Sequence, residues 1–212
     1  GPEIAVASTK AYVSQVAILI SLAIYFAEIL GKNKEEIEKY KSEILGLPEK
    51  IKKVLENKEE FQKIAKKMVK LFDTFYIGRG NDYNIALEGS LKLKEISYIH
   101  SEAYQAGELK HGPIALVEDG TYIIGIITNS NIAEKTLSNL EEVITRGAKV
   151  ILITNLDITN DKMEIVKIPK VKDIIAPILA IIPLQLIAYY IAKEKGLDVD
   201  KPRNLAKSVT VE

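Results

Sequence analysis

Apolar residues in the second half of the chain gather in short continuous runs separated by longer amphipathic stretches. Four such runs occur, at 75–78, 121–128, 149–154 and 164–168. Helical spacing of apolar residues occupies about 84–100, 132–146 and 173–195. Continuous apolar runs are typical of strands buried on both faces, and strands that alternate with helices predict a parallel sheet. We therefore expect an α/β fold with helices on both faces of the sheet.

The first third of the chain has a different pattern. Residues 13–30 are apolar but interrupted by Ser14, Gln15, Ser21 and Glu28, and the similar stretch 174–192 is interrupted by two prolines and a glutamine. A membrane span needs about 20 mostly apolar residues, so both stretches predict helices buried within a soluble fold. Ser8 or Thr9 is placed to cap the first helix. Residues 32–70 hold most of the lysine and glutamate and predict two or three surface helices.

The two apolar stretches resemble each other. A shift of 165 positions aligns five identical residues: Leu19 with Leu184, Ala23 with Ala188, Tyr25 with Tyr190, Ala27 with Ala192, and Gly31 with Gly196. Five identities also arise by chance in apolar sequence. If the repeat is structural, the first helix closes a domain whose opening strands are absent.

Composition narrows the functional classes. The 212 residues are 47% hydrophobic and carry 29 basic and 29 acidic side chains, so the net charge is zero. General nucleic-acid and membrane-surface binders need a positive face, and we expect neither partner. Cysteine is absent, which excludes a disulfide framework, a cysteine zinc site and a thiol nucleophile, and fits a cytoplasmic protein. The opening Gly1-Pro-Glu-Ile has no basic segment typical of a signal peptide.

Three charged residues share one face of the helix predicted after the first strand. Glu88, Lys92 and Glu95 are spaced by four and three positions. They form either a solvent-facing ladder of ion pairs, worth about 0.2–0.5 kcal/mol per pair, or two carboxylates around one ammonium beside a ligand. In the second case one carboxylate moves a proton while the lysine holds it.

The histidines and glycine loops give weaker signals. His111 lies in a loop closed by Gly112-Pro113, where it is either structural or an acid–base group near neutral pH. His100 is interpreted as a structural residue at the end of the helix. Gly78-Arg79-Gly80 is too short for a dinucleotide fingerprint. Because ligands of parallel sheets bind beyond the carboxyl ends of the strands, this loop and the one after Thr128 form a candidate site.

The carboxy-terminal segment carries a possible nucleophile. Lys207 follows Leu205-Ala206 and precedes Ser208-Val209, all small or apolar. Burial among such neighbours favours the uncharged amine, which attacks carbonyl carbons. The alternative is an ordinary lysine on a docked tail.

Three stretches resemble the isomerase region of the glutamine–fructose-6-phosphate aminotransferases: residues 3–11, residues 86–113 and residues 198–212. The Lys-His-Gly-Pro segment ending at Pro113 and the tail are the specific parts. The remainder would fit many sugar-isomerase (SIS) domains. The resemblance implies flavodoxin-like SIS domains, with residues 1–65 as the remnant of an incomplete first SIS domain, 66–197 as the second, and 198–212 as an active-site tail.

The resemblance also implies roles for single residues. Lys207 would form a Schiff base at C2 of fructose 6-phosphate, and Glu95 would carry a proton between C1 and C2. Lys92 and Glu88 would support Glu95. His111 would assist ring opening across a homodimer with a shared active site. The residues expected to line the sugar are Val6, Ser8 and Ala206.

The implied reaction makes glucosamine 6-phosphate with ammonia from a glutaminase domain that these 212 residues lack. No metal or organic cofactor is implied. The Ser/Thr-rich phosphate loop of the first SIS domain is also missing, so we expect the chain alone to be incomplete for catalysis. Two alternatives remain: a glutaminase-free SIS sugar-phosphate isomerase or deaminase, and a non-catalytic sugar-phosphate-binding module.

Overall fold

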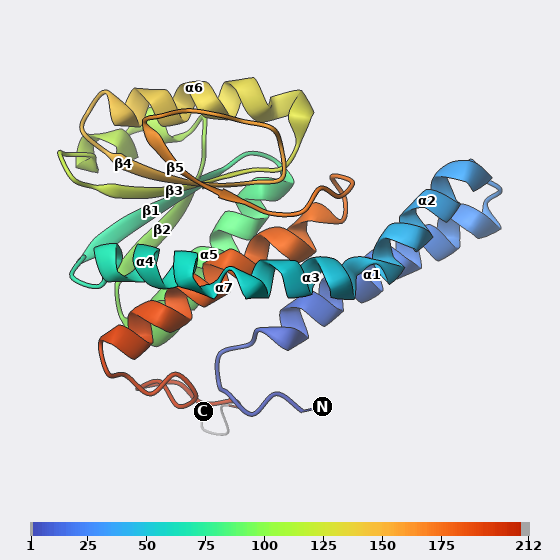
Figure 1. Cartoon of the computed structure of the whole chain (residues 1–212), viewed down its shortest axis with the longest axis horizontal. Helices are drawn as coiled ribbons and strands as arrows, with labels where there is room; N and C mark the ends of the chain where they lie inside the picture. The colour runs from blue at the N-terminus through green and yellow to red at the C-terminus, as the bar shows by residue number, and fades with distance from the viewer. Residues whose placement is uncertain (1, 209–212) are drawn as a thin grey trace.

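The computed structural model describes residues 2–208, so Gly1 and the last residues of the predicted tail, 209–212, lie outside it. Its centre is one parallel sheet with the strand order β2-β1-β3-β4-β5 (Figure 1). The strands are β1 (Asp73–Gly78), β2 (His100–Gln105), β3 (Tyr122–Ile127), β4 (Lys149–Thr154) and β5 (Met163–Lys167). The predicted α/β class with a parallel sheet is confirmed.

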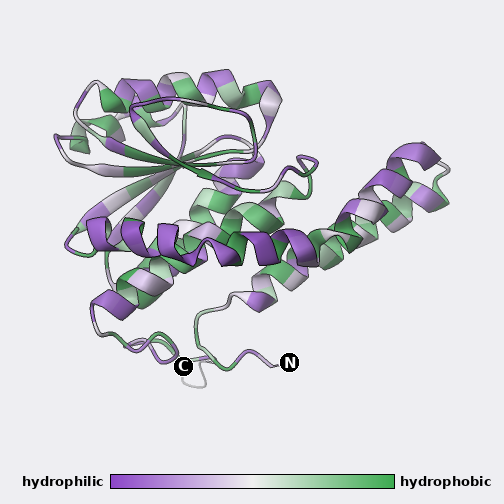
Figure 2. Cartoon of the chain, viewed as in Figure 1, coloured by the Kyte–Doolittle hydropathy of each residue, from purple (hydrophilic) through white to green (hydrophobic). Residues whose placement is uncertain are grey.

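Helices cover both faces of the sheet. One face is covered by α6 (Ala133–Ile144), and the other by α4 (Lys58–Met68), α5 (Asn81–Ser97) and α7 (Ala176–Glu194) (Figure 1). Two separate hydrophobic cores follow from this layering, one on each side of the sheet. Polar residues cover the outer side of α4, whereas α7 is mostly apolar, as Figure 2 shows. Buried residues, among them Leu184, occur along the whole of α7, and this explains why its sequence is a continuous apolar stretch.

The edge strand β2 was not predicted. We expected a helix to His100, but α5 ends at Ser97, Tyr98 adopts a left-handed conformation, and His100 begins β2. This strand pairs only with β1. Only Ser101 of its six residues is buried, so its sequence lacks the apolar run that identified the other strands.

The first helices form a separate arm. The helices α1 (Lys10–Ile29) and α2 (Lys34–Leu45) pair and project from the sheet, and α3 (Leu47–Glu56) leads back to α4 (Figure 1). Both α1 and α7 are long and apolar enough to cross a membrane by length and composition alone. The apolar window of α7 is 67% buried, as predicted, but that of α1 is only 6% buried. The prediction of a buried first helix is therefore wrong for this chain.

The start of α1 is capped from outside the helix. Thr9 occupies the cap position but its side chain makes no capping bond, contrary to the prediction for Ser8 or Thr9. Instead the Glu3 carboxylate accepts the backbone N–H groups of Thr9, Lys10 and Ala11. Partial burial raises the pKa of Glu3, but these hydrogen bonds outweigh it and lower the pKa to about 2. Glu3 thereby ties the N-terminal loop to α1.

Candidate active site

The helix α5 lies close against α7 because of a glycine. A Cβ at Gly89 would lie 2.5 Å from Leu184 Cδ1 and 3.1 Å from Tyr76 Cε1. This close approach fixes the rotation of α5, and the face that carries Glu88 and Lys92 turns away from the sheet.

That face is buried nonetheless. The Lys92 side chain is only 4% exposed, and its Nζ lies 2.6 Å from Glu95 Oε2 and 3.4 Å from Glu88 Oε1. A solvent-facing ladder of ion pairs is therefore excluded. Burying an ion cluster costs several kcal/mol per ion in desolvation, so a buried triad points to function more than to stability.

The surroundings of the triad set its charge. Burial raises the pKa of Glu88, and the nearby Lys92 ammonium opposes this in part. Burial and then the Glu88 charge raise the pKa of Tyr12, which reaches the triad from α1. Glu95 Oε2 is buried and has no hydrogen bond of good geometry to any described residue. Its 2.6 Å contact with Lys92 is therefore best described as a close ion pair.

Lys207 lies against the N-terminal loop. Its Nζ donates to the backbone oxygens of Ala5 (3.0 Å) and Val6 (3.4 Å) and lies 3.5 Å from Ser8 Oγ. The Lys207 side chain is 46% exposed, so the predicted burial of this amine is not found in the described chain. Ala206 is exposed beside it. The tail lysine thus lies beside all three predicted sugar-lining residues, Val6, Ser8 and Ala206.

A cavity lies between Lys92 of the triad and the N-terminal loop. It has a volume of about 160 Å³ and is lined by Lys92 of α5, by Ala5 and Ala7 of the N-terminal loop, and by Asp200 of the tail. The Ala5 oxygen that accepts from Lys207 belongs to the same loop. The Lys92–Glu95 pair and the tail lysine therefore border one region of the molecule.

Comparison with known proteins identifies the fold of this region. Residues 73–194, more than half of the chain, match the family described as the SIS domain. This chain belongs to the SIS domain family. It is 58% identical, over its whole length, to a glutamine–fructose-6-phosphate aminotransferase (isomerizing) of Clostridium tetani. It covers 36% of that relative, so the chain spans about a third of the length of the curated relatives it matches.

Comparison with solved structures supports the same fold. The C-terminal domain of the glucosamine-fructose-6-phosphate aminotransferase of Francisella tularensis superposes with a TM-score of 0.89 at 40% identity, over 95% of this chain and 58% of that one. A glucosamine-6-phosphate deaminase of Thermotoga maritima superposes with a TM-score of 0.73 at 26% identity, over 99% of this chain and 59% of that one.

The carboxyl edge of the SIS sheet is closed by a side chain of the chain itself. Asp82, at the start of α5, is almost fully buried and accepts the Thr128 backbone N–H (2.9 Å) and hydroxyl. Asp82 thus joins the start of α5, just after Gly78-Arg79-Gly80, to the loop at Thr128. The charged residues Glu88, Lys92 and Glu95 lie further along α5.

His111 is not joined to the SIS-domain triad. It ends a short 3-10 helix (Leu109–His111) and is exposed. Among residues 2–208, no hydrogen bond or ion pair links its side chain to Glu95 or to Lys207. A role within the same chain is therefore not supported by contact.

Several residues near the site were not predicted. Glu3 caps α1 and lies 3.9 Å from Lys207 Nζ. Gln185 of α7 lines the cavity beside Lys92, and its buried Nε2 has no partner among the described residues. Tyr98 and Arg203 join α5 to the tail. Glu3, Tyr98 and Arg203 had a usable signal, since each lies in one of the three stretches that resemble the aminotransferases, whereas Gln185 lies in none of them.

Proposed function

We propose that this chain forms the isomerase region of a glutamine–fructose-6-phosphate aminotransferase, in which fructose 6-phosphate and ammonia become glucosamine 6-phosphate and water. The observation that carries the proposal is the buried Lys92 between Glu88 and Glu95, next to a cavity shared with the loop that holds Lys207. The 58% identity to a protein with that printed activity supports it.

The Lys207 amine, once deprotonated, attacks C2 of the open-chain ketose, and loss of water leaves an iminium. Ammonia then displaces the lysine from C2, so the nitrogen stays with the sugar. Glu95 removes a proton from C1 and returns it to C2, while the C1 hydroxyl proton leaves and C1 becomes the aldehyde. The iminium makes the C1 proton acidic, so a carboxylate is a sufficient base. No metal or organic cofactor is required.

The remaining residues support this proton transfer. Lys92 holds the Glu95 carboxylate at 2.6 Å, and Glu88 offsets the lysine charge. Val6, Ser8 and Ala206, which surround Lys207, line the sugar. His111 of the partner subunit assists ring opening in a homodimer, which accounts for its lack of contacts with the triad. We place the protein in the cytoplasm, where this substrate class is found.

Borohydride trapping tests the proposal in the full-length protein. Fructose 6-phosphate with sodium borohydride should leave a reduced sugar adduct on the peptide that contains Lys207, because hydride adds to C2 of the iminium. The Lys207→Arg variant should give neither adduct nor product. Glu95→Gln should still form the adduct but lose roughly 10²–10⁴-fold in product formation. Glucosamine 6-phosphate formation by Lys207→Arg would exclude the Schiff-base role.

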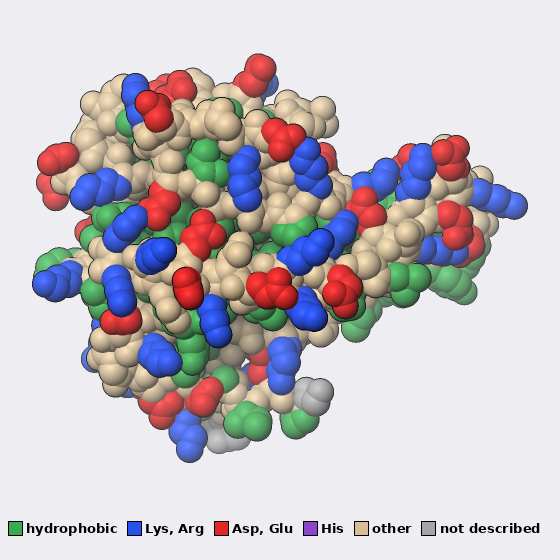
Figure 3. Space-filling model, in the orientation of Figure 1, with side chains coloured by type: hydrophobic (Ala, Val, Ile, Leu, Met, Phe, Trp, Pro, Cys, Tyr) green, Lys and Arg blue, Asp and Glu red, His purple; other side chains and the backbone are tan. Residues whose placement is uncertain are grey.

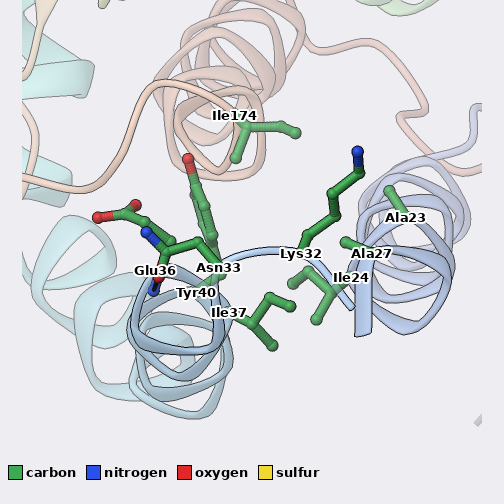
Figure 4. Close-up of a pocket in the computed structure, with 9 residues that line it drawn as sticks. All are labelled: Ala23, Ile24, Ala27, Lys32, Asn33, Glu36, Ile37, Tyr40 and Ile174. Atoms are coloured by element: carbon green, nitrogen blue, oxygen red, sulfur yellow. Dashed lines mark hydrogen bonds between the residues drawn. The ribbon is translucent and has the colours of Figure 1, made fainter. Parts of the chain in front are cut away.

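We also propose that residues 1–65 close a first SIS domain that lies outside this chain. In α7, the positions Leu184 and Ala188 are fully buried. The equivalent Leu19 of α1 is 65% exposed. A hollow of about 260 Å³ opens between α1 and α2 beside Ile174, with Ile24 and Ile37 at its wall (Figure 4). A second sheet preceding α1 would cover these side chains, with the glutaminase domain upstream of it.

This proposal predicts weak substrate binding by the isolated chain. The missing first domain would supply the phosphate-binding loop. Calorimetry should therefore show fructose 6-phosphate binding far more weakly to the 212-residue chain than to the full-length protein. Equal affinities would contradict the domain assignment.

A related deaminase is the second candidate function. The structural match to a glucosamine-6-phosphate deaminase at 26% identity favours it specifically. Such an enzyme runs the same carbon chemistry in reverse and releases ammonia. Glutamine-dependent product formation by the full-length protein favours the aminotransferase, whereas ammonia release from glucosamine 6-phosphate without glutaminase activity favours the deaminase. A sugar-phosphate sensor would show neither activity.

A further inference from the structure

Two non-glycine residues in the described chain have positive φ angles, and they lie at the same contact. Tyr98 has a φ of 60° and Asn204 a φ of 62°. Asparagine tolerates this conformation, but tyrosine in it costs about 1–2 kcal/mol. Tyr98 occupies the residue that ends α5, where glycine is the usual choice. A tyrosine kept at a glycine position suggests that its side chain has a separate role.

The Tyr98 side chain holds the tail by two contacts. Its hydroxyl accepts the backbone N–H of Arg203 at 2.8 Å. The Arg203 guanidinium lies over the same ring, 4.2 Å from its centroid. A cation over an aromatic face contributes about 0.5–1 kcal/mol at an exposed site. We call this pair, Tyr98 and Arg203, the tail latch.

The latch connects the segment that carries Glu95 to the segment that carries Lys207. Tyr98 follows Glu95 by three positions on the end of α5, and Arg203 precedes Lys207 by four. Upstream of the latch the tail is fixed, because Val6 donates to the Asp200 oxygen at 2.9 Å and Pro202 is buried. Beyond it, residues 204–208 are all exposed.

Among the described residues, the latch is therefore the last backbone anchor before the amine. Asn204 reverses the chain directly after Arg203, and Lys207 follows the anchor by only four positions. Four residues span at most about 14 Å. Loss of the anchor would lengthen the free segment and let Lys207 leave its position beside Ala5 and Val6.

We propose that Tyr98 and Arg203 are positioning residues that set the Lys207 amine relative to the Glu95 carboxylate. This inference rests on the proposed Schiff-base function. Tyr98 touches no reacting atom in this role and acts through the tail. Glycine would adopt this backbone conformation without strain, but only an aromatic residue here places a ring under Arg203.

The test separates two roles of Tyr98, ending the helix α5 and holding the tail. If Tyr98 only ends the helix, Tyr98→Asn should keep its rate, whereas loss of the latch should lower it. In the full-length protein, Tyr98→Asn suits the left-handed conformation, so the midpoint of thermal unfolding should stay equal or rise. Its borohydride trapping rate and kcat should nevertheless fall about tenfold, with the KM for fructose 6-phosphate changed less than about twofold, because misplacing a reacting group mainly costs rate. Arg203→Met should give the same losses.

Two further variants complete the test. The double variant Tyr98→Asn/Arg203→Met should be no slower than either single variant, since both remove one contact. Lys201→Met removes a positive charge from the same tail outside the latch and should behave as the wild type. If Tyr98→Asn fails to fold, Tyr98→Phe removes only the hydroxyl and should slow trapping about threefold, the loss expected for one neutral hydrogen bond.

Wild-type trapping and kcat in both the Tyr98 variant and Arg203→Met would overturn the latch. Failure of the proposed function looks different, because Lys207→Arg would then keep its activity. If Lys207→Arg is inactive while the Tyr98 and Arg203 variants behave as the wild type, only the latch is wrong.

Discussion

The buried carboxylate at the carboxyl edge of the sheet should make this chain less stable as the pH rises from about 4 to about 6. Burial raises the pKa of Asp82, and the nearby Asp173 charge adds to this, while hydrogen bonds from Thr128 and Asn129 lower it in part. The result is a pKa of about 6 instead of the ordinary 3.8. Between these values the folded chain binds more protons than the unfolded chain, so its free energy of unfolding falls with rising pH.

The magnitude follows from that difference of about two pKa units. Each unit corresponds to 1.36 kcal/mol, so ionised Asp82 costs about 3 kcal/mol at pH 7.5. Asp82→Asn removes this cost. The amide oxygen accepts the Thr128 N–H, and the amide nitrogen donates to the Thr128 hydroxyl, so both hydrogen bonds with Thr128 persist. The variant should be more stable than the wild type by about 2–3 kcal/mol at pH 7.5 and about equal to it at pH 4.

Urea unfolding of the 212-residue chain, followed by circular dichroism between pH 4 and pH 8, measures this difference. Other groups titrate in the same range, but they are common to both proteins and cancel in the comparison. The exposed Asp161→Asn supplies the matched control and should change stability by less than about 0.5 kcal/mol throughout. A stability difference between Asp82→Asn and the wild type that stays constant with pH would refute the reasoning.

Three further predictions concern the packing of α5, self-association through α1 and the charge of Glu88. Gly89→Ala should lower the free energy of unfolding by about 1–2 kcal/mol, because its Cβ meets Leu184; a more stable variant in urea would contradict the packing of α5. The isolated chain should self-associate through α1, and replacing Leu19 and Phe26 by serine should give a monomer by light scattering, whereas an unchanged particle mass would disprove the role of this face. Glu88→Gln should gain stability relative to the wild type as the pH rises through the raised pKa of Glu88; thermal melts that show no pH trend would contradict it.

The prediction of self-association rests on an exposed apolar surface of α1 and α2. Apolar side chains gather along the underside of α1 and the end of α2 in Figure 3. They recur at helical spacing and are all exposed: Ile18, Leu19, Leu22, Tyr25, Phe26, Ile29, Leu30 and Leu45. Contiguous apolar patches of this kind mark interaction sites on soluble proteins. In the isolated chain another copy is the nearest apolar surface available.

The fold was largely predictable because burial leaves a local pattern. The run ending at Thr128 is apolar at nearly every position since β3 has neighbours on both sides and helices on both faces. The strand from His100 to Gln105 buries only one of its six residues and carries no such pattern. The predicted end of α5 was also wrong. Helices commonly end at a glycine in the left-handed conformation, but here Tyr98 takes that conformation, so the sequence gives no glycine to mark the helix end.

The site was predictable only in part, because its environment comes from distant segments. Spacing placed Glu88, Lys92 and Glu95 on one helix face, but it did not say whether that face is buried. The N-terminal loop and the tail decide this, and the Lys207–Ala5 hydrogen bond joins residues 202 positions apart. Conversely, the apolar neighbours of Lys207 suggested burial that the described chain does not provide.

The triad explains why charge is kept in a place where apolar residues would be more stable. Two carboxylates around one ammonium carry a net negative charge, and burying that charge is unfavourable. Burial raises the pKa of Glu88, and the Lys92 ammonium opposes this in part. Lys92 Nζ lies nearer to Glu95 Oε2, at 2.6 Å, than to Glu88 Oε1, at 3.4 Å. In the function we propose, the Glu95 carboxylate accepts a carbon-bound proton and gives it back to the adjacent carbon, and an apolar replacement of any member of the triad would disturb that transfer.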